Sequence, residues 1–237
     1  MSGLAIAALI AAVVSIAVYG AALAWAAPRR EWALLVTVAA AALPLSWLAY
    51  YVLRAPLSAG VDATFGPELA RWVWPLYAPL TEEPAKLLLL AAPWFAHRVT
   101  RANAAHVGTA IGLGFGVGEI ALATDLVRAG PDAAASPWWQ FTGFISERYM
   151  VCLVHGAFTA TALAVWRSAK GGLGQGLGAA MGLHLIANLP VLLLPILIAD
   201  PAQRGAAISL WLLLFWSAAV LWLLMLGCRS GATGAKA

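Results

Sequence analysis

Charged residues are scarce in this chain of 237 residues: they make up 10% of it, whereas hydrophobic residues make up 63%, and the mean hydropathy is +0.86. This composition excludes a soluble domain, because the surface of a soluble domain needs far more charge to stay solvated. The chain also lacks a hydrophilic stretch long enough to fold as a second domain. We therefore expect a single integral membrane domain over residues 1–237.

Two further scarcities narrow the range of partners and sites. The sequence has no basic run of the kind that binds nucleic acid, so we exclude that partner class. It has only two cysteines, Cys152 and Cys228, which lie in or beside different apolar segments. These are too few for a disulfide framework or a thiolate metal site, and we expect both to be small buried hydrophobic residues.

Long apolar segments are what the sequence does contain. A transmembrane helix needs about 20 mostly apolar residues, and seven segments meet this requirement. The sequence thus predicts an all-α fold, a polytopic transmembrane helical bundle of about seven spans with the lipid bilayer as its surroundings. The expected spans are 4–27, 32–53, 75–95, 107–127, 144–166, 173–198 and 206–227.

Lysine and arginine are distributed unevenly between alternate loops. Eight of them lie on the side of the C-terminus and five on the side of the N-terminus, and each of the five shares its loop or helix end with an acidic residue. Because cytoplasmic loops are enriched in basic residues, we expect the N-terminus outside and the C-terminus in the cytoplasm. The alanine- and tryptophan-rich composition is typical of a GC-rich bacterial genome, so the expected location is the bacterial cytoplasmic membrane.

Strongly polar side chains interrupt four of the expected spans. A charged group at membrane depth costs about 2.5–3.5 kcal/mol, so we expect these side chains to face a shared interior where they perform chemistry or transport. Carboxylates and imidazoles at one site are suited to activating water, as general bases, metal ligands or proton carriers. The residues concerned are Glu82, Glu83, Glu119, His155 and His184.

The glutamate pair lies in a proline-rich region. Pro75 and Pro79 predict that no helix runs through it, and Thr81 is expected to cap a helix that begins there. The positive end of the helix dipole would then favour ionised Glu82 and Glu83, with Lys86 close enough to pair with either. A capped helix start near the membrane interface would explain one glutamate at this place. It accounts less well for two adjacent glutamates with a lysine close by.

Glycines recur at four-residue spacing in the fourth span. Gly108, Gly112 and Gly116 share one face, which predicts close packing against a neighbouring helix. Phe115 and Glu119 share another face, and Glu119 lies well inside the span. A structural hydrogen bond to a neighbouring helix is the alternative to a functional role for this glutamate.

The fifth and sixth spans each carry a histidine with a polar neighbour on the same face. Arg148 and His155 lie on one helical stripe, and His184 lies one turn from Asn188. A histidine and an amide on one face could supply one ligand or base and one oxyanion donor. Alone, each pair could equally hold two helices together by hydrogen bonds.

Taken in order, these motifs resemble those of the PrsW-type intramembrane proteases, relatives of the CAAX-processing and bacteriocin-processing endopeptidases. Glu82 to Lys86 looks like the EExxK motif of that family, and Phe115 to Glu119 looks like its FxxxE motif. Arg148 with His155 resembles the third motif, and His184 to Asn188 resembles the final HxxxN. The resemblance implies a motif-bearing catalytic core at about residues 75–198.

The resemblance further implies hydrolysis of a peptide bond of a membrane-anchored protein, such as an anti-sigma factor. Glu82 or Glu83 would act as general base on water. Two classes besides an enzyme stay open, namely a non-catalytic scaffold or chaperone and a proton-coupled transporter. His155, His184 and Glu119 would bind a metal ion, with Zn²⁺ as the candidate, or would hold the water. Asn188 would stabilise the oxyanion. Lys86, Phe115 and Arg148 would support these groups.

The order of the spans also predicts where the site lies in the bilayer. With the N-terminus outside, all four motifs fall in the outer half of the membrane. We therefore expect cleavage near the extracytoplasmic juxtamembrane region of the substrate.

Overall fold

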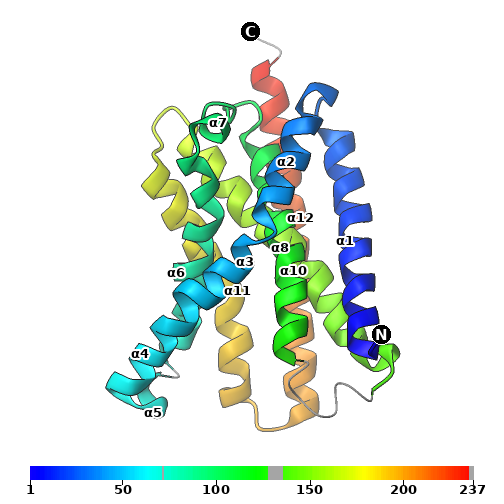
Figure 1. Cartoon of the computed structure of the whole chain (residues 1–237), viewed down its shortest axis with the longest axis vertical. Coiled ribbons are helices and arrows are strands. Elements are labelled where there is room, and N and C mark those ends of the chain that lie inside the picture. The colour runs from blue at the N-terminus through cyan, green and yellow to red at the C-terminus, as the bar shows by residue number, and fades with distance from the viewer. Residues whose placement is uncertain (71, 128–135, 235–237) are drawn as a thin grey trace.

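The computed structural model describes residues 1–70, 72–127 and 136–234 of the chain. These residues form the predicted all-α bundle, whose helices run side by side along one long axis (Figure 1). Within the described part of the chain, six helical stretches are long and apolar enough to cross a membrane. They are Gly3–Ala26, Arg29–Phe65, Ala104–Val127, Trp138–Trp166, Leu173–Leu197 and Pro201–Gly227.

Four of the expected spans agree closely with single helices. Their bounds differ from the prediction by only a few residues, because a long apolar run satisfies its own backbone hydrogen bonds only as a helix in lipid. The four helices are α1 (Gly3–Ala26), α8 (Ala104–Val127), α10 (Thr142–Trp166) and α11 (Leu173–Leu197), with the short η4 (Trp138–Phe141) before α10. The last span, α12 (Pro201–Gly234), is longer than predicted.

The second pass is a chain of helical segments rather than one regular helix. Pro44 separates its first part from the rest, since proline removes a backbone donor, and a π-helical stretch follows. The pass leans away from α1 towards the base of the bundle (Figure 1). Its parts are η1 (Arg29–Glu31), α2 (Trp32–Ala42), α3 (Leu45–Trp47), η2 (Leu48–Arg54), α4 (Ala55–Phe65) and, beyond Gly66, α5 (Pro67–Ala70).

The third pass corrects the prediction around the glutamate pair. One helix, α6 (Trp74–Leu87), runs straight through Pro79 and Pro84, and it is followed by η3 (Leu88–Ala91) and α7 (Pro93–Ala96). Thr81 is therefore not an N-cap: its hydroxyl donates to the carbonyl of Tyr77, 2.7 Å away. Prolines are tolerated inside buried membrane helices because nearby groups satisfy the freed carbonyls.

This correction also changes the electrostatics of the pair. Glu82 and Glu83 lie in the last two turns of α6, where the helix dipole is negative, so the dipole does not stabilise their charge. Neighbouring cations must do so instead.

The glycine face of α8 packs against α10, as the spacing predicted. A Cβ atom added at Gly112 would overlap the backbone carbonyl of His155, and one at Gly108 would overlap the backbone of Ala160. Gly114 and Gly118 lie equally close to the backbone of the second pass. The glycines therefore let α8 lie at the centre of the bundle, in direct contact with two neighbours.

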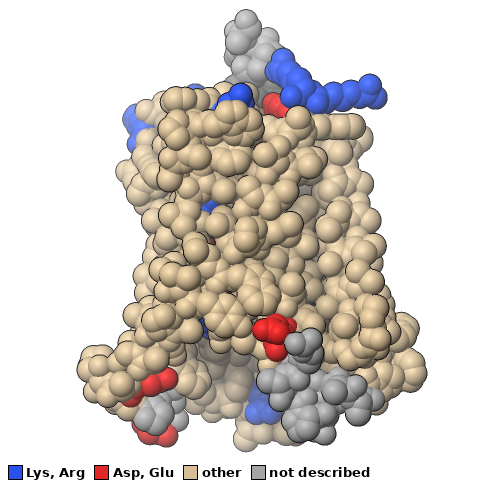
Figure 2. All heavy atoms as spheres, in the orientation of Figure 1, with Lys and Arg blue, Asp and Glu red and all other residues tan. Residues whose placement is uncertain are grey.

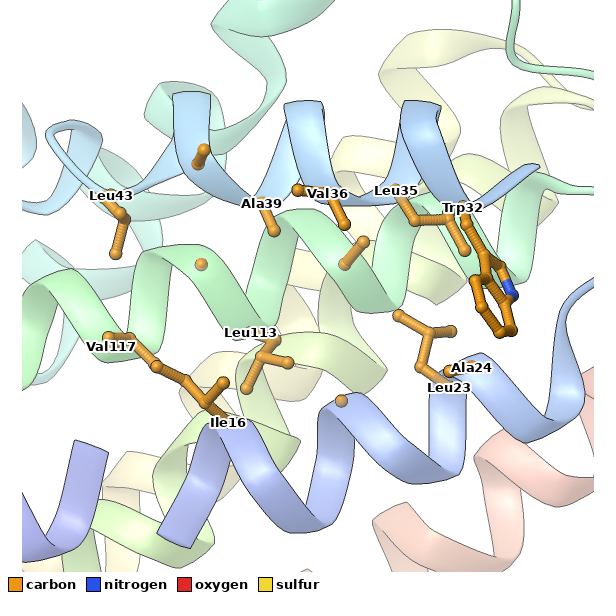
Figure 3. Close-up of a pocket in the computed structure, with 14 residues that line it drawn as sticks. Ile16, Leu23, Ala24, Trp32, Leu35, Val36, Ala39, Leu43, Leu113 and Val117 are labelled. Atoms are coloured by element: carbon orange, nitrogen blue, oxygen red, sulfur yellow. The ribbon is translucent and has the colours of Figure 1, made fainter. Parts of the chain in front are cut away.

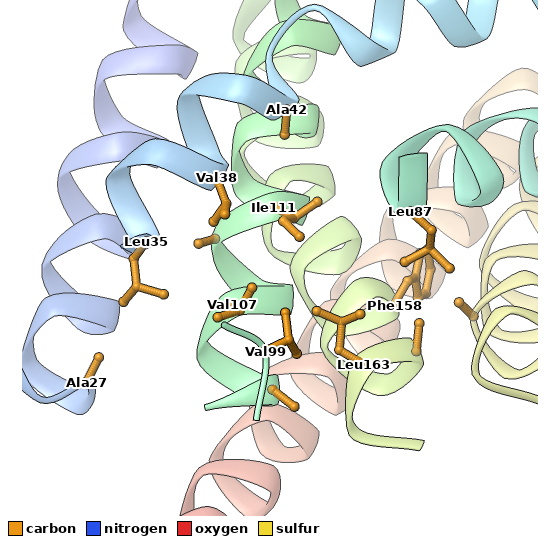
Figure 4. Close-up of a cluster of buried hydrophobic side chains, with 14 residues drawn as sticks. Ala27, Leu35, Val38, Ala42, Leu87, Val99, Val107, Ile111, Phe158 and Leu163 are labelled. Carbon is orange, nitrogen blue, oxygen red and sulfur yellow. The ribbon is translucent and has the colours of Figure 1, made fainter. Parts of the chain in front are cut away.

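The main apolar cluster lies beyond the polar residues, towards the end of the bundle where α1 ends (Figure 4). Val38 from α2, Val107 and Ile111 from α8, and Phe158 and Leu163 from α10 meet there. By contrast, many leucines of α12 are exposed, among them Leu210, Leu214 and Leu221. Exposed leucines along a helix of this length form a surface suited to lipid.

Candidate functional site

The four motif-bearing passes bring their polar side chains together between α6, α8, α10 and α11. Glu82, Glu83, His155 and His184 are all buried, with exposed fractions of 7%, 1%, 3% and 4%. Glu119 joins them from α8 and is partly exposed. Five polar groups that the sequence distributes over 103 positions thus occupy one place in the interior.

Glu83 is held from two sides at a single oxygen. The Lys86 ammonium donates to Oε1 of Glu83 across 2.6 Å, and Nδ1 of His184 lies 2.6 Å from the same oxygen. Since a carboxylate only accepts, Nδ1 of His184 carries the hydrogen. The other ring nitrogen of His184, Nε2, is then an acceptor with an available lone pair.

His155 is held in the opposite tautomer. Its Nδ1 lies 2.7 Å from Nζ of Lys86, and its Nε2 lies 2.8 Å from Oε2 of Glu119. An ammonium group only donates, so Nδ1 accepts and Nε2 carries the hydrogen that is donated to Glu119. Lys86 therefore fixes His155 as a donor to Glu119, while Glu83 fixes His184 as an acceptor.

Two arginines add further ion pairs to the cluster. Arg148 lies 3.1 Å from Glu119 and also pairs with its neighbour Glu147, and Arg54 lies 3.7 Å from Glu82. Each of the carboxylates of Glu82, Glu83 and Glu119 therefore has a cation beside it, from Arg54, Lys86 and Arg148 in that order. Buried ion pairs persist when such contacts and additional hydrogen bonds offset the cost of removing the charges from water.

One oxygen of the cluster differs from the others. Oε2 of Glu82 is buried and accepts no hydrogen bond from the described residues. It lies 3.9 Å from Nε2 of His184 and 4.0 Å from Nε2 of His155. A buried polar atom without a partner is costly, so this oxygen marks the place where the site would receive a water, a substrate group or a cation.

Glu82, His155 and His184 could together hold a metal ion, since one ligand atom from each lies within 4.8 Å of the others. Oε2 of Glu82 and Nε2 of His184 suit this role, because Glu83 orients His184 as an outer-shell carboxylate does at metal sites. Nε2 of His155 is directed at Glu119 instead. The predicted metal set contained Glu119, whereas the grouping in the structure contains Glu82.

Aromatic rings surround the buried lysine. Nζ of Lys86 lies 4.7 Å from the ring centre of Phe115 and 5.8 Å from that of Phe158, and Lys86 is fully buried. The ring of His184 stacks on Phe158 with 5.0 Å between centres. The faces of the rings attract the ammonium, and they also restrict how His184 and His155 can turn.

A cavity of about 450 Å³ adjoins the cluster, bounded by α6, α8, α10, α11 and α12. Glu82, Glu119, His155, His184 and Asn188 all line it. Its remaining walls are largely apolar, from residues such as Val191, Leu192, Ile208, Trp211 and Phe215. A second cavity of about 250 Å³ reaches Glu82 and Glu119 from the side of η2 and includes Tyr50 and Arg54.

Sequence reasoning missed two contributors to the site. Arg54 is one of the five basic residues that the sequence places on the side of the N-terminus, at a loop or helix end shared with an acidic residue; in the structure it belongs to the π-helical segment η2 and pairs with Glu82. Its position directly after an apolar run was the only signal. Phe158 lies three residues beyond His155, next to it on the same helix face, and that spacing could have suggested it.

Comparisons of the chain with protein-family models, with curated proteins and with solved structures find no match.

Proposed function

We propose that this protein is an intramembrane endopeptidase that hydrolyses a peptide bond of a membrane-anchored protein by means of glutamate-activated water. The observation that carries the proposal is the pair formed by Oε2 of Glu82 and Nε2 of His184. Within the described part of the chain neither atom has a hydrogen-bond partner; the two lie 3.9 Å apart, and both residues line the same cavity. The resemblance of the ordered motifs to PrsW-type proteases supports the same reaction.

The reaction begins with a water placed between these two atoms. One of its hydrogens bonds to Nε2 of His184, which orients the water, and the other passes to Glu82 as the oxygen attacks the carbonyl carbon of the peptide bond. The carbonyl oxygen gains the negative charge, and the side-chain amide of Asn188 is positioned along the same cavity to stabilise it. Glu82 then returns its proton to the leaving nitrogen as the carbon–nitrogen bond breaks, which yields an amine and a carboxylic acid whose hydroxyl keeps the second hydrogen of the water.

The remaining polar residues position this pair. Glu83 keeps His184 in the required tautomer, and Lys86 holds Glu83. Glu119, anchored by Arg148, keeps His155 beside the water site. A Zn²⁺ ion held by Glu82 and the histidines would add a Lewis acid that polarises the substrate carbonyl.

The location of the cavity suggests which part of the substrate is cut. Its lining includes the first turns of α10 and α12 and the later turns of α11, which meet at the end of the bundle opposite the C-terminus (Figure 1). Figure 2 shows most of the visible Lys and Arg side chains at the C-terminal end and most of the visible acidic side chains near the other end, where a basic side chain also appears. By the positive-inside rule, the cavity would open towards the outside of a bacterial cytoplasmic membrane, next to an extracytoplasmic juxtamembrane segment.

Proteomics of shed ectodomains tests the proposal. Cells that produce the wild-type protein should release fragments of membrane-anchored proteins, and Glu82→Gln should reduce this release by about 10²–10⁴-fold, the usual contribution of a general base. Glu31→Gln is a matched control, since Glu31 pairs with His106 at the other end of the bundle. If Glu82→Gln releases the same fragments as the wild type, the proposal fails; a protein that binds the same partners without cutting them would be a scaffold.

A further inference from the structure

A further hollow in the bundle is lined by none of the residues of the proposed catalytic site. A groove of about 370 Å³ lies between α1 and α2, with α8 as its floor (Figure 3). Trp32 stands at one end of the groove, and Leu43 and Val117 stand at the other. Ile16, Leu23 and Leu113 line it between these ends, and its wall is almost entirely apolar.

The dimensions of the groove match a hydrocarbon chain. From Trp32 to Leu43 the helix rises by about 16 Å, close to half of the roughly 30 Å hydrocarbon core of a bilayer. An acyl chain of one leaflet therefore matches the groove in length, and its apolar surface suits the apolar wall around a volume of about 370 Å³.

The end of the groove at Trp32 carries positive charge. Arg29 and Arg30 lie in η1, the turn that joins the two helices of the groove, and both are exposed. The neighbouring Glu31 is turned towards His106, 3.2 Å away, and neither arginine forms an ion pair within the described part of the chain. Nε1 of Trp32 donates to the carbonyl of Ala27, which closes this turn at the level where tryptophans meet lipid headgroups.

We propose that this groove is a binding site for one anionic phospholipid of the leaflet at the C-terminal end of the bundle. An acyl chain lies along α8 between α1 and α2, and the phosphate and headgroup lie against Arg29 and Arg30. Each arginine near a membrane surface favours an anionic lipid by roughly fivefold, so the pair should give a preference of about 25-fold over a lipid without net charge.

Native mass spectrometry of the purified full chain can test this site. The probes are phosphatidylglycerol and phosphatidylcholine with identical acyl chains. We expect the wild type to retain one phosphatidylglycerol with the 25-fold preference, and Arg29→Gln/Arg30→Gln to lose most of that preference. The control Arg101→Gln/Lys170→Gln removes the same charge from exposed turns elsewhere and should keep it.

A second pair of variants distinguishes lipid binding in the groove from the general electrostatic attraction between anionic lipids and the protein surface. A Cβ at Gly20 meets open space inside the groove, so Gly20→Leu should fill it and reduce binding of both lipids without disturbing the helices. Gly178 on α11 also faces open space, and Gly178→Leu should bind like the wild type. The proposal would be overturned if the wild type retained the two lipids equally, or if the two charge variants had equal effects. Unchanged binding by Gly20→Leu would also overturn it.

Discussion

At the scale of single residues, Lys86 is the group on which the polar cluster depends. It is fully buried and contacts both Glu83 and His155. Lys86→Met keeps the length of the side chain but leaves Glu83 a buried charge without its cation. Removing one partner of a buried ion pair costs about 3–5 kcal/mol, so we expect a loss of that size in thermal or chemical unfolding.

The exposed lysine Lys170 gives the matched control, because Lys170→Met should change stability by less than about 0.5 kcal/mol. Nitrogen-15 NMR of the histidines provides a further readout. The wild type should show His155 protonated at Nε2 and His184 at Nδ1, and the variant should lose the fixed tautomer of His155. Unchanged stability together with unchanged tautomers would contradict the role given to Lys86.

A second expectation at this scale concerns metal dependence. Each of the three carboxylates of the site already has a cation beside it, and Nε2 of His155 is bound to Glu119. In the proposed mechanism Glu82 and His184 activate water without a metal, so we expect peptidase activity of the purified protein to survive chelation. Metal analysis before and after chelation checks the treatment. Loss of activity that added Zn²⁺ restores would instead show that these residues work as metal ligands.

At the scale of helices, the packing of α8 against α10 sets the distance between Glu119 and His155. Gly112→Ala would place a methyl group on the backbone of His155 and force the two helices apart. Overpacking of this kind costs about 1–3 kcal/mol, which should appear as a lower melting temperature and reduced activity. Gly178→Ala meets open space and should be neutral or slightly stabilising, since alanine favours helix more than glycine does. Similar effects of both substitutions would show that the close contact is unimportant.

The helix α6 shows where local sequence rules give the wrong answer. Pro75 and Pro79 predicted a break, because proline inside a helix of a soluble protein usually causes one. In this bundle α6 is buried against η2 and α11, and the hydroxyl of Thr81 bonds a carbonyl of the preceding turn. Packing and side-chain hydrogen bonds therefore outweigh the local preference, and they place the glutamates on the last turns of the helix.

At the scale of the whole molecule, the orientation in the membrane decides which compartment supplies water and substrate. We expect the first turn of α12 at Gln203 to face outwards and the turn at Ser168 to face the cytoplasm, because basic residues follow both α7 and α10. These two segments lie together at one end of the bundle, where Arg167 donates to the carbonyl of Ala96 (Figure 1). In a background without native cysteines, Gln203→Cys should react with an impermeant reagent in intact cells, and Ser168→Cys should react only after lysis. The reverse pattern would move the cavity to the cytoplasmic face.

The sequence by itself determined the membrane class, the all-α bundle and most of the span boundaries. These follow from local properties: an apolar run of about 20 residues forms a helix in lipid because no other partner exists for its backbone groups. The glycine spacing of α8 likewise predicted a contact face, and the cost of polar groups in lipid predicted that the glutamates and histidines would share the interior.

Only the tertiary structure decided which atoms of the site pair with which. Lys86 and His155 are 69 positions apart, and Glu83 and His184 are 101 apart, so their contacts depend on how each helix is rotated and how far it is shifted along its neighbours. The same packing fixes opposite tautomers in the two histidines, brings Arg54 to Glu82, and leaves Oε2 of Glu82 with no hydrogen-bond partner among the described residues. Helical periodicity specifies a face of each helix, but the hydrogen bonds that give each polar side chain its partner form only once the faces are packed together.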